Sequence, residues 1–164
     1  MTAFSSVDRI AGLIRARLLA STALQITDEN GDTVIPNILD RDENPAVLAD
    51  SPEGLPAICV IPIGDKADGI KPYIGSADWE HRFQVVIAGY YRATSNETRG
   101  ENIYDDIATL RKKAYDCAEL FRGNNAFFQP GCISDVKVEL GYFIMVDYVI
   151  YKFLVTLSVT TIEV

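Results

Sequence analysis

Apolar residues recur at helical spacing in two stretches of the chain. Residues 6–20 carry a stripe made of Val7, Ile10, Ile14 and Leu18. Residues 98–122 carry a longer stripe made of Ile103, Ile107, Leu110, Ala114, Cys117 or Ala118, and Phe121. Two possible capping boxes give the second helix two alternative starting points, and Gly123 is a residue at which the helix is expected to end. The pattern therefore predicts two amphipathic helices.

Alternation of apolar and polar residues predicts strands before and after the second helix. Residues 80–92 carry apolar groups on both faces, which is typical of a central strand. Residues 57–63 form a short β-branched run in which Pro62 favours an edge strand or a strand end. In residues 152–163, Phe153, Val155, Leu157 and Val159 face one way and the hydroxyl residues face the other.

The remaining segments are less regular. Residues 132–140 alternate well, Gly141 breaks the pattern, and residues 142–151 are apolar and aromatic. Residues 21–56 contain the turn signal "DENGD" and four prolines, with room for a short strand at Thr33 to Ile35. We interpret residues 26–56 as a long acidic excursion after the first helix.

The order helix, strand, strand, helix, strand, strand places strands in neighbouring pairs. We therefore predict an α+β fold in which two main helices pack on a mostly antiparallel sheet, with residues 1–164 forming a single domain. The length suits one domain that needs no disulfide or metal for stability.

Charge is unevenly distributed along the chain. Residues 26–69 contain ten acids against two bases, which accounts for the whole formal net charge of −8. A chain with no basic tract is not expected to hold phosphate backbones, so DNA could pass such a surface without binding to it. No apolar run is long enough to span a membrane, and no signal peptide is recognisable. Three widely spaced cysteines fit buried free thiols in a cytosolic protein.

Rare residues gather in "DWEHRF", residues 78–83, which holds the only tryptophan and the only histidine. Ser76 and Asp78 lie beside His81, whereas the partners of a catalytic triad usually come from distant segments. No G-x-S-x-G motif presents a strained serine, and no phosphate-binding loop motif is present. The acidic run from Asp40 lacks the glycine and glutamate of an EF-hand. We therefore expect no enzyme, cofactor or metal site here, and interpret "DWEHRF" as the entry into a strand.

The element order has a counterpart among known families. A leading helix is followed by "AICVIPIGD", by "HRFQVVIAGYYRAT", by the helix "ENIYDDIATLRKKAYDCAELF" and by the last strand "KFLVTLSVTTIEV". This layout resembles the tail terminator proteins of long-tailed bacteriophages, the group similar to minor tail protein U. The acidic segment is larger than that group leads us to expect.

The resemblance implies a virion structural protein that is assembled in the host cytoplasm. Such proteins form a homohexameric ring at the head-proximal end of the tail, where they stop growth of the tail tube. The ring offers a docking surface to the neck and connector proteins of the head, and DNA passes through its channel. An acidic lumen would keep that DNA mobile.

A ring requires contact patches on each subunit. The candidates are Trp79 at the start of a strand, the apolar stretch Tyr142 to Tyr151, and the terminal strand. The candidate contacts are Trp79, Tyr142, Phe143, Tyr148, Tyr151, Thr160 and Ile162. Two other readings stay open. One is a head–tail connector, neck or head-completion protein, and the other is a small cytosolic enzyme or ligand-binding domain that would depend on His81.

Overall fold

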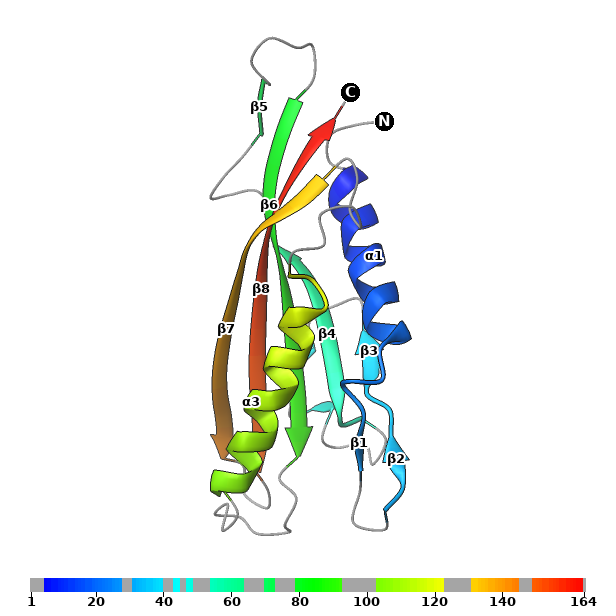
Figure 1. The fold of residues 1–164 in the computed structure, drawn as a ribbon, viewed down its shortest axis with the longest axis vertical. Helices are drawn as coiled ribbons and strands as arrows, with labels where there is room; N and C mark the ends of the chain where they lie inside the picture. The colour runs from blue at the N-terminus through cyan, green and yellow to red at the C-terminus, as the bar shows by residue number, and fades with distance from the viewer. Residues whose placement is uncertain are drawn as a thin grey trace.

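The fold is α+β, with helices packed on a mostly antiparallel sheet (Figure 1). The computed structural model describes residues 5–27, 31–39, 43–44, 47–48, 54–63, 70–72, 79–92, 103–122, 131–144 and 149–163. The helices are α1 (Ser5–Ala20) and α3 (Ile103–Glu119). The strands are β1 (Ile26–Thr27), β2 (Thr33–Val34), β3 (Asn37–Leu39), β4 (Ala57–Ile63), β5 (Ile70–Pro72), β6 (Trp79–Arg92), β7 (Gly131–Ile144) and β8 (Val149–Glu163).

Three long strands dominate the main sheet, whose order in the described residues is β3-β4-β6-β8-β7, with β5 paired to the start of β6. β3 runs parallel to β4, and every other pairing in this sheet is antiparallel. β6 is central, as its two apolar faces predict. β7 and β3 form the two edges, and β1 and β2 form a separate antiparallel pair.

The alternation predicted for residues 152–163 is confirmed. Phe153, Val155, Leu157 and Val159 are buried on one face of β8, and the residues between them are half-buried on the other. The predicted break at Gly141 is wrong, because β7 continues through it to Ile144 with Gly141 opposite Lys152. Glycine interrupts the apolar alternation in the sequence, but it does not prevent the backbone from staying extended. At Gly141, an added Cβ would also meet nothing within 4 Å.

Both helices cover the same face of the sheet. Ile10, Ile14 and Leu18 of α1 share one buried cluster with the apolar stripe of α3. From the sheet, the cluster takes alternate residues of β4, β6 and β8: Ile58, Val60, Phe83, Val85, Ile87, Phe153, Val155 and Leu157. The helical spacing predicted both stripes, and burial of this apolar area is the main stabilising term of the fold.

A second, smaller cluster lies on the opposite face, at one end of the sheet. Cys59, Ala88, Tyr90 and Ile150 are buried there, and Leu48 and Leu55 from the segment before β4 pack against them. The irregular excursion therefore covers part of the face that the helices leave uncovered. Its sequence also supplies β3, a strand that the pattern did not predict, whereas the short strand expected near Thr33 is present as β2.

The position of Pro62 agrees with a strand end. β3 pairs only with Ala57–Cys59 of β4, so the residues of β4 that follow have β6 on one side alone. Pro62 is exposed in this part of the strand, where a missing backbone N–H costs no ladder hydrogen bond. The expected capping boxes and the Gly123 stop of the second helix fall outside the described residues.

Lys113 joins α3 to the segment that follows α1. Its Nζ donates a hydrogen bond to the carbonyl of Ala23 at 2.9 Å and another to the carbonyl of Gln25. On the same segment, the Tyr91 hydroxyl of β6 donates to the carbonyl of Leu24 at 3.3 Å. Two elements that are distant in sequence thus hold the three carbonyls of residues 23–25.

Replacing Lys113 by methionine is expected to lower the free energy of unfolding by about 1 to 2 kcal/mol, because hydrogen bonds from a charged donor are lost while the apolar stem remains. Amides of residues 21–25 should also exchange faster with deuterium. Lys112→Met is the matched control, because Lys112 is exposed and pairs with Asp116 on the same helix. Equal unfolding free energies for the two variants in urea would contradict the role given to Lys113.

Candidate assembly surface

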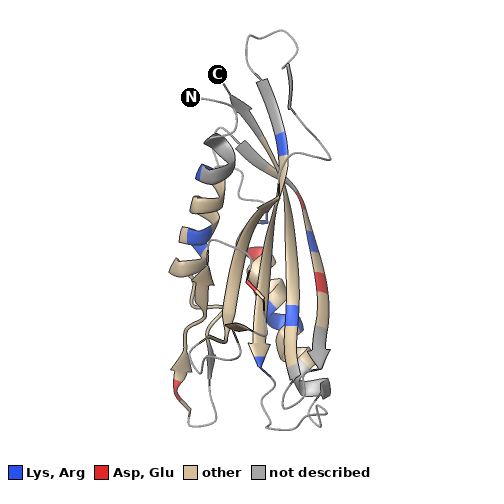
Figure 2. Ribbon diagram, turned by 180° about the vertical axis from the view of Figure 1, so that it is seen from behind, with Lys and Arg blue, Asp and Glu red and all other residues tan. Residues whose placement is uncertain are grey.

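One face of the sheet has neither α1 nor α3 packed on it over its described length (Figure 2). We call it the open face and define it by seven side chains from the three inner strands: Ile61, Ile63, Val86, Leu154, Thr156, Ser158 and Thr160. Six are half-buried and Ile63 is 42% exposed. The strand register places them side by side, since Val86 lies opposite both Ile61 and Thr156.

The open face carries few charges among its described residues. Arg82 lies opposite Thr160 near one end, and Lys152 opposite Tyr90 near the other. Between them, the seven side chains are apolar or carry hydroxyls, and Gln84 adds an uncharged amide opposite Ile63 and Ser158. The nearest charges on this side are Lys137 and Glu139 of β7, which pair with each other opposite Thr156 and Leu154. A second protein surface could therefore cover the inner strands without burying an unpaired ion. Depletion of charge at the centre of a patch is typical of protein interfaces.

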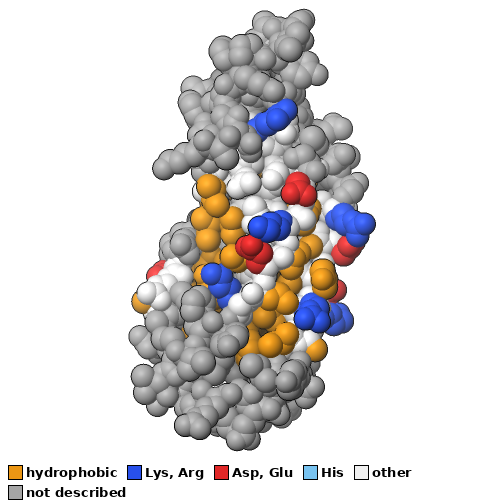
Figure 3. Space-filling view, turned by 90° about the vertical axis from the view of Figure 1, so that its left-hand side faces the viewer, with side chains coloured by type: hydrophobic (Ala, Val, Ile, Leu, Met, Phe, Trp, Pro, Cys, Tyr) orange, Lys and Arg blue, Asp and Glu red, His pale blue; other side chains and the backbone are white. Residues whose placement is uncertain are grey.

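The edge of the sheet at β7 has a different character (Figure 3). We call residues Asp135–Gly141 the β7 edge, and here the strand register is regular. On the side of the open face, Lys137 pairs with Glu139 at 2.9 Å. On the helix side, Val136, Val138 and Leu140 are only partly buried, with Leu140 39% exposed. Figure 3 looks onto this edge and shows two bands of hydrophobic side chains with basic and acidic groups between them.

The predicted contact residues are distributed over the ends of the long strands. Trp79 begins β6, opposite Pro72 and Glu163, and Ile162 lies opposite Glu80. Tyr142 and Phe143 lie opposite Tyr151 and Ile150 where β7 meets β8. Of these four predicted residues the structure describes the backbone alone, and Tyr148 lies outside the described residues.

Two predicted contact residues have described side chains. Thr160 is half-buried and belongs to the open face. Tyr151 is 2% exposed and packs in the main core, so its side chain supports the sheet from within and is not available to a neighbouring subunit. Burial follows from its odd position on β8, which turns it toward the helices.

The sequence pattern alone did not reveal most of the open face or the β7 edge. Thr156 and Ser158 were recognised as the polar face of a strand, but Ile61, Ile63 and Val86 come from other strands and meet them only through pairing. The alternation of charges in "DVKVE" was a signal for an exposed strand. It did not show that this strand would be the last in the sheet.

Other expected features can be placed only in part. His81 lies in β6 opposite Ile70 and Thr161, with only its backbone described. Of the ten acids in residues 26–69, the structure describes Asp32 and Glu43, and the expected acidic lumen otherwise falls outside it. In the described ranges, no three His, Cys, Asp or Glu side chains gather in a way that could hold a metal ion.

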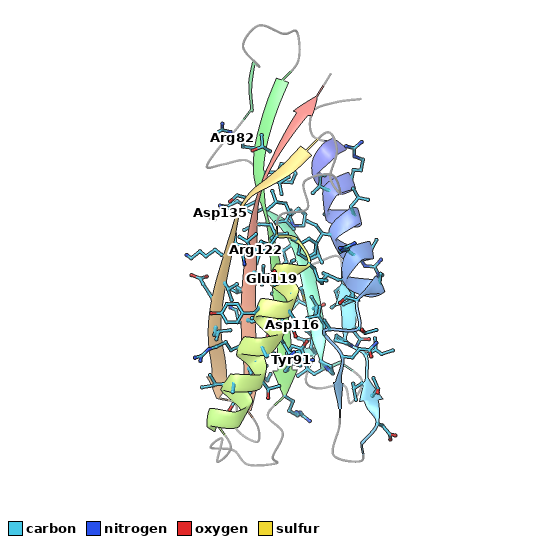
Figure 4. All side chains as sticks on the ribbon, in the orientation of Figure 1. Arg82, Tyr91, Asp116, Glu119, Arg122 and Asp135 are labelled. Atoms are coloured by element: carbon cyan, nitrogen blue, oxygen red, sulfur yellow. The ribbon has the colours of Figure 1, made fainter. Side chains whose placement is uncertain are left out.

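Three described titratable groups have shifted pKa values: Lys113 and Cys117 on α3, and Tyr91 on β6, which is labelled in Figure 4. Burial raises the pKa of the Cys117 thiol to about 12. Burial, with a smaller contribution from Cys117, raises the pKa of the Tyr91 hydroxyl well above its usual value. Burial lowers the pKa of Lys113, and the charge of the neighbouring Lys112 contributes a smaller effect in the same direction. Tyr91 and Cys117 belong to the core, and Lys113 bonds the segment that follows α1, so all three are separate from the open face.

The described helices include none that is long and apolar enough to cross a membrane. Comparison with known proteins finds no protein-family model and no curated protein that matches this chain.

Proposed function

We propose that this chain is a tail terminator of a long-tailed bacteriophage. In this function, copies of the chain form a ring that caps the tail tube, stops its growth and offers a surface to the neck of the head. DNA passes through the ring without being bound by sequence. The resemblance in element order, from the leading helix to the last strand, supports the proposal.

The observation that carries the proposal is the open face. A sheet face that stays uncovered is normally polar, because an antiparallel sheet keeps one face for water. Here Ile61, Val86 and Leu154 lie on that face beside the hydroxyls of β8. A surface of this kind gains stability when a second protein covers it.

A ring needs two different patches on each subunit, because neighbouring copies meet head to tail. The open face supplies one patch. The outward side of α1 is a candidate for the other, since Leu19 is 54% exposed and Arg9 and Arg15 lie exposed on the same helix. The two patches lie on opposite faces of the sheet, so one subunit can contact two neighbours at once.

Electron micrographs of the purified protein, alone and mixed with tail tubes, test the proposal. We expect rings, and a ring at one end of each tube. The Thr156→Lys variant places a charge in the middle of the open face and should abolish both. Thr109→Lys, on an exposed position of α3, is the matched control and should leave them unchanged.

Three outcomes would count against the proposal. A protein that stays monomeric and never caps tubes would contradict it, and so would a Thr156→Lys variant that is folded and still caps. Binding to tailless heads, with no binding to tubes, would instead favour a connector or head-completion protein. Circular dichroism melts of both variants show whether they are folded.

A further inference from the structure

The strand β7, which contains the β7 edge, is the longest edge strand described in this sheet. β7 has 14 residues and ends the strand order, with β8 on one side and no described strand on the other. The opposite edge, β3, has three residues. An edge strand presents a row of backbone N–H and C=O groups that can pair with another strand. The question is which strand complements this one.

We propose that the β7 edge pairs with the β7 edge of a second copy of this chain, antiparallel, about a twofold axis at Val138. Val138 then lies opposite the Val138 of the other copy, and Lys137 lies opposite Glu139. Because the contact is isologous, each Glu139 also lies opposite a Lys137. The sequence of this strand is therefore complementary to itself in charge.

The apolar side of the strand fits the same register. Val136 lies opposite the other copy's Leu140, and Leu140 opposite its Val136. These side chains and Val138 are partly exposed in the single chain. Pairing brings six of them together on the helix side, next to α3, which packs over β7 and β8 and carries Tyr115 at 56% exposure.

Antiparallel registers with axes at Val136, Lys137 or Glu139 are less favourable. An axis at Lys137 places lysine against lysine and Asp135 against Glu139, and an axis at Glu139 places glutamate against glutamate. An axis at Val136 opposes Asp135 and Lys137. However, the bulge between Ile133 and Asp135 would then lie two residues from the axis and limit regular pairing to three residues. The axis at Val138 leaves seven residues, 135–141, in regular register.

The ion pair seen within one chain is compatible with this contact. Lys137 and Glu139 are neighbours on one face of the strand and contact each other at 2.9 Å, with side chains 65% and 51% exposed. In the paired state, each lysine lies between its own Glu139 and that of the other copy. The two ion pairs become a four-charge group at the centre of a continuous sheet.

This inference goes beyond the proposed function. A twofold contact closes at two copies, whereas a ring contact joins different patches and does not. A dimer without rings would count against the proposed function alone. Rings that are unaffected by changes in the β7 edge, with no dimer, would count against the twofold contact alone.

Two charge reversals and their mixture test the contact by sedimentation velocity over a range of concentrations. Lys137→Glu alone places four glutamates together in a homodimer, and Glu139→Lys alone places four lysines together. We expect each variant to dimerise at least about tenfold more weakly than the unchanged protein. Lys112→Glu, on the exposed side of α3, is the matched control and should dimerise normally.

The mixture of the two variants separates contact between chains from the ion pair within a chain. In a heterodimer, both cross-strand pairs again join opposite charges, while the pairs within each chain remain alike. We expect the mixture to recover the dimer. The proposal is overturned if the unchanged protein stays monomeric, if either single variant dimerises normally, or if the mixture fails to recover.

Discussion

Replacing Gly89 by alanine is expected to lower the free energy of unfolding by about 2 to 3 kcal/mol. Gly89 of β6 lies directly opposite Phe153 of β8, and a Cβ there would be 2.8 Å from Cδ1 of the ring and nearer still to Cε1 and Cζ. The ring has no room to move, because Phe153 is 0% exposed and stacks against Tyr91 with centroids 6.1 Å apart. A methyl group at position 89 therefore forces strain into the centre of the core.

Urea unfolding followed by circular dichroism measures this effect. Gly141→Ala is the matched control, because Gly141 is also a strand glycine but a Cβ there would meet nothing within 4 Å. We expect the control to be neutral or slightly stabilising, since alanine reduces the conformational freedom of the unfolded chain. Similar losses in the two variants would contradict the packing given to Phe153.

A second substitution tests whether the loss of stability in Gly89→Ala comes from the contact with Phe153 or from a general weakening of the strand. Phe153→Leu removes the ring and should destabilise the protein by itself. In the Gly89→Ala background it should cost less, because the added methyl group occupies part of the vacated space. The double mutant is therefore expected to be more stable than the sum of the single changes predicts. Strict additivity would show that residues 89 and 153 do not interact.

Raising the pH from 7 to 11 is expected to lower the free energy of unfolding by roughly 2 to 3 kcal/mol through Cys117 alone. The thiol titrates at about 9.0 in the unfolded chain and at about 12 in the folded protein. Between these values the folded state holds more protons than the unfolded state, so stability falls as the pH rises. The raised pKa of Tyr91 acts in the same direction above pH 10.

Urea unfolding at several pH values between 7 and 11 tests this dependence in the unchanged protein and in Cys117→Ala. The variant loses the thiol and should show a shallower alkaline decline. Lys113 acts in the opposite direction, because its lowered pKa means that the unfolded chain holds more protons near its titration. A variant whose alkaline decline is as steep as that of the unchanged protein would contradict the burial of the thiol.

The sequence predicted much of the fold because its apolar residues follow simple periods. The stripes of α1 and α3 and the alternation of β6 and β8 were visible without any knowledge of contacts. The errors came where local pattern and long-range pairing disagree. Gly141 interrupts an apolar alternation, yet pairing with β8 keeps β7 extended past it. β3 is only three residues long, and its pairing with β4 is what makes it a strand.

The candidate surface depended much more on tertiary structure. Trp79, Tyr142 and Phe143 were chosen because aromatic residues often mark contacts, but such a choice does not tell an exposed ring from a buried one. Tyr151 illustrates this, since its place in the alternation of β8 puts it in the core at 2% exposure. The open face combines side chains of β4, β6 and β8, whose contact is set by strand register.

By itself, the sequence determined which residues share a face of each element, since side-chain direction repeats every two residues in a strand and every 3.6 in a helix. From this follow the α+β fold and the two helical stripes. Only the tertiary structure decided which face of β8 the helices cover and which strand ends the sheet. Those outcomes depend on pairing between residues far apart in the chain. Those pairings place the alternating charges of "DVKVE" on the outer strand of the described sheet.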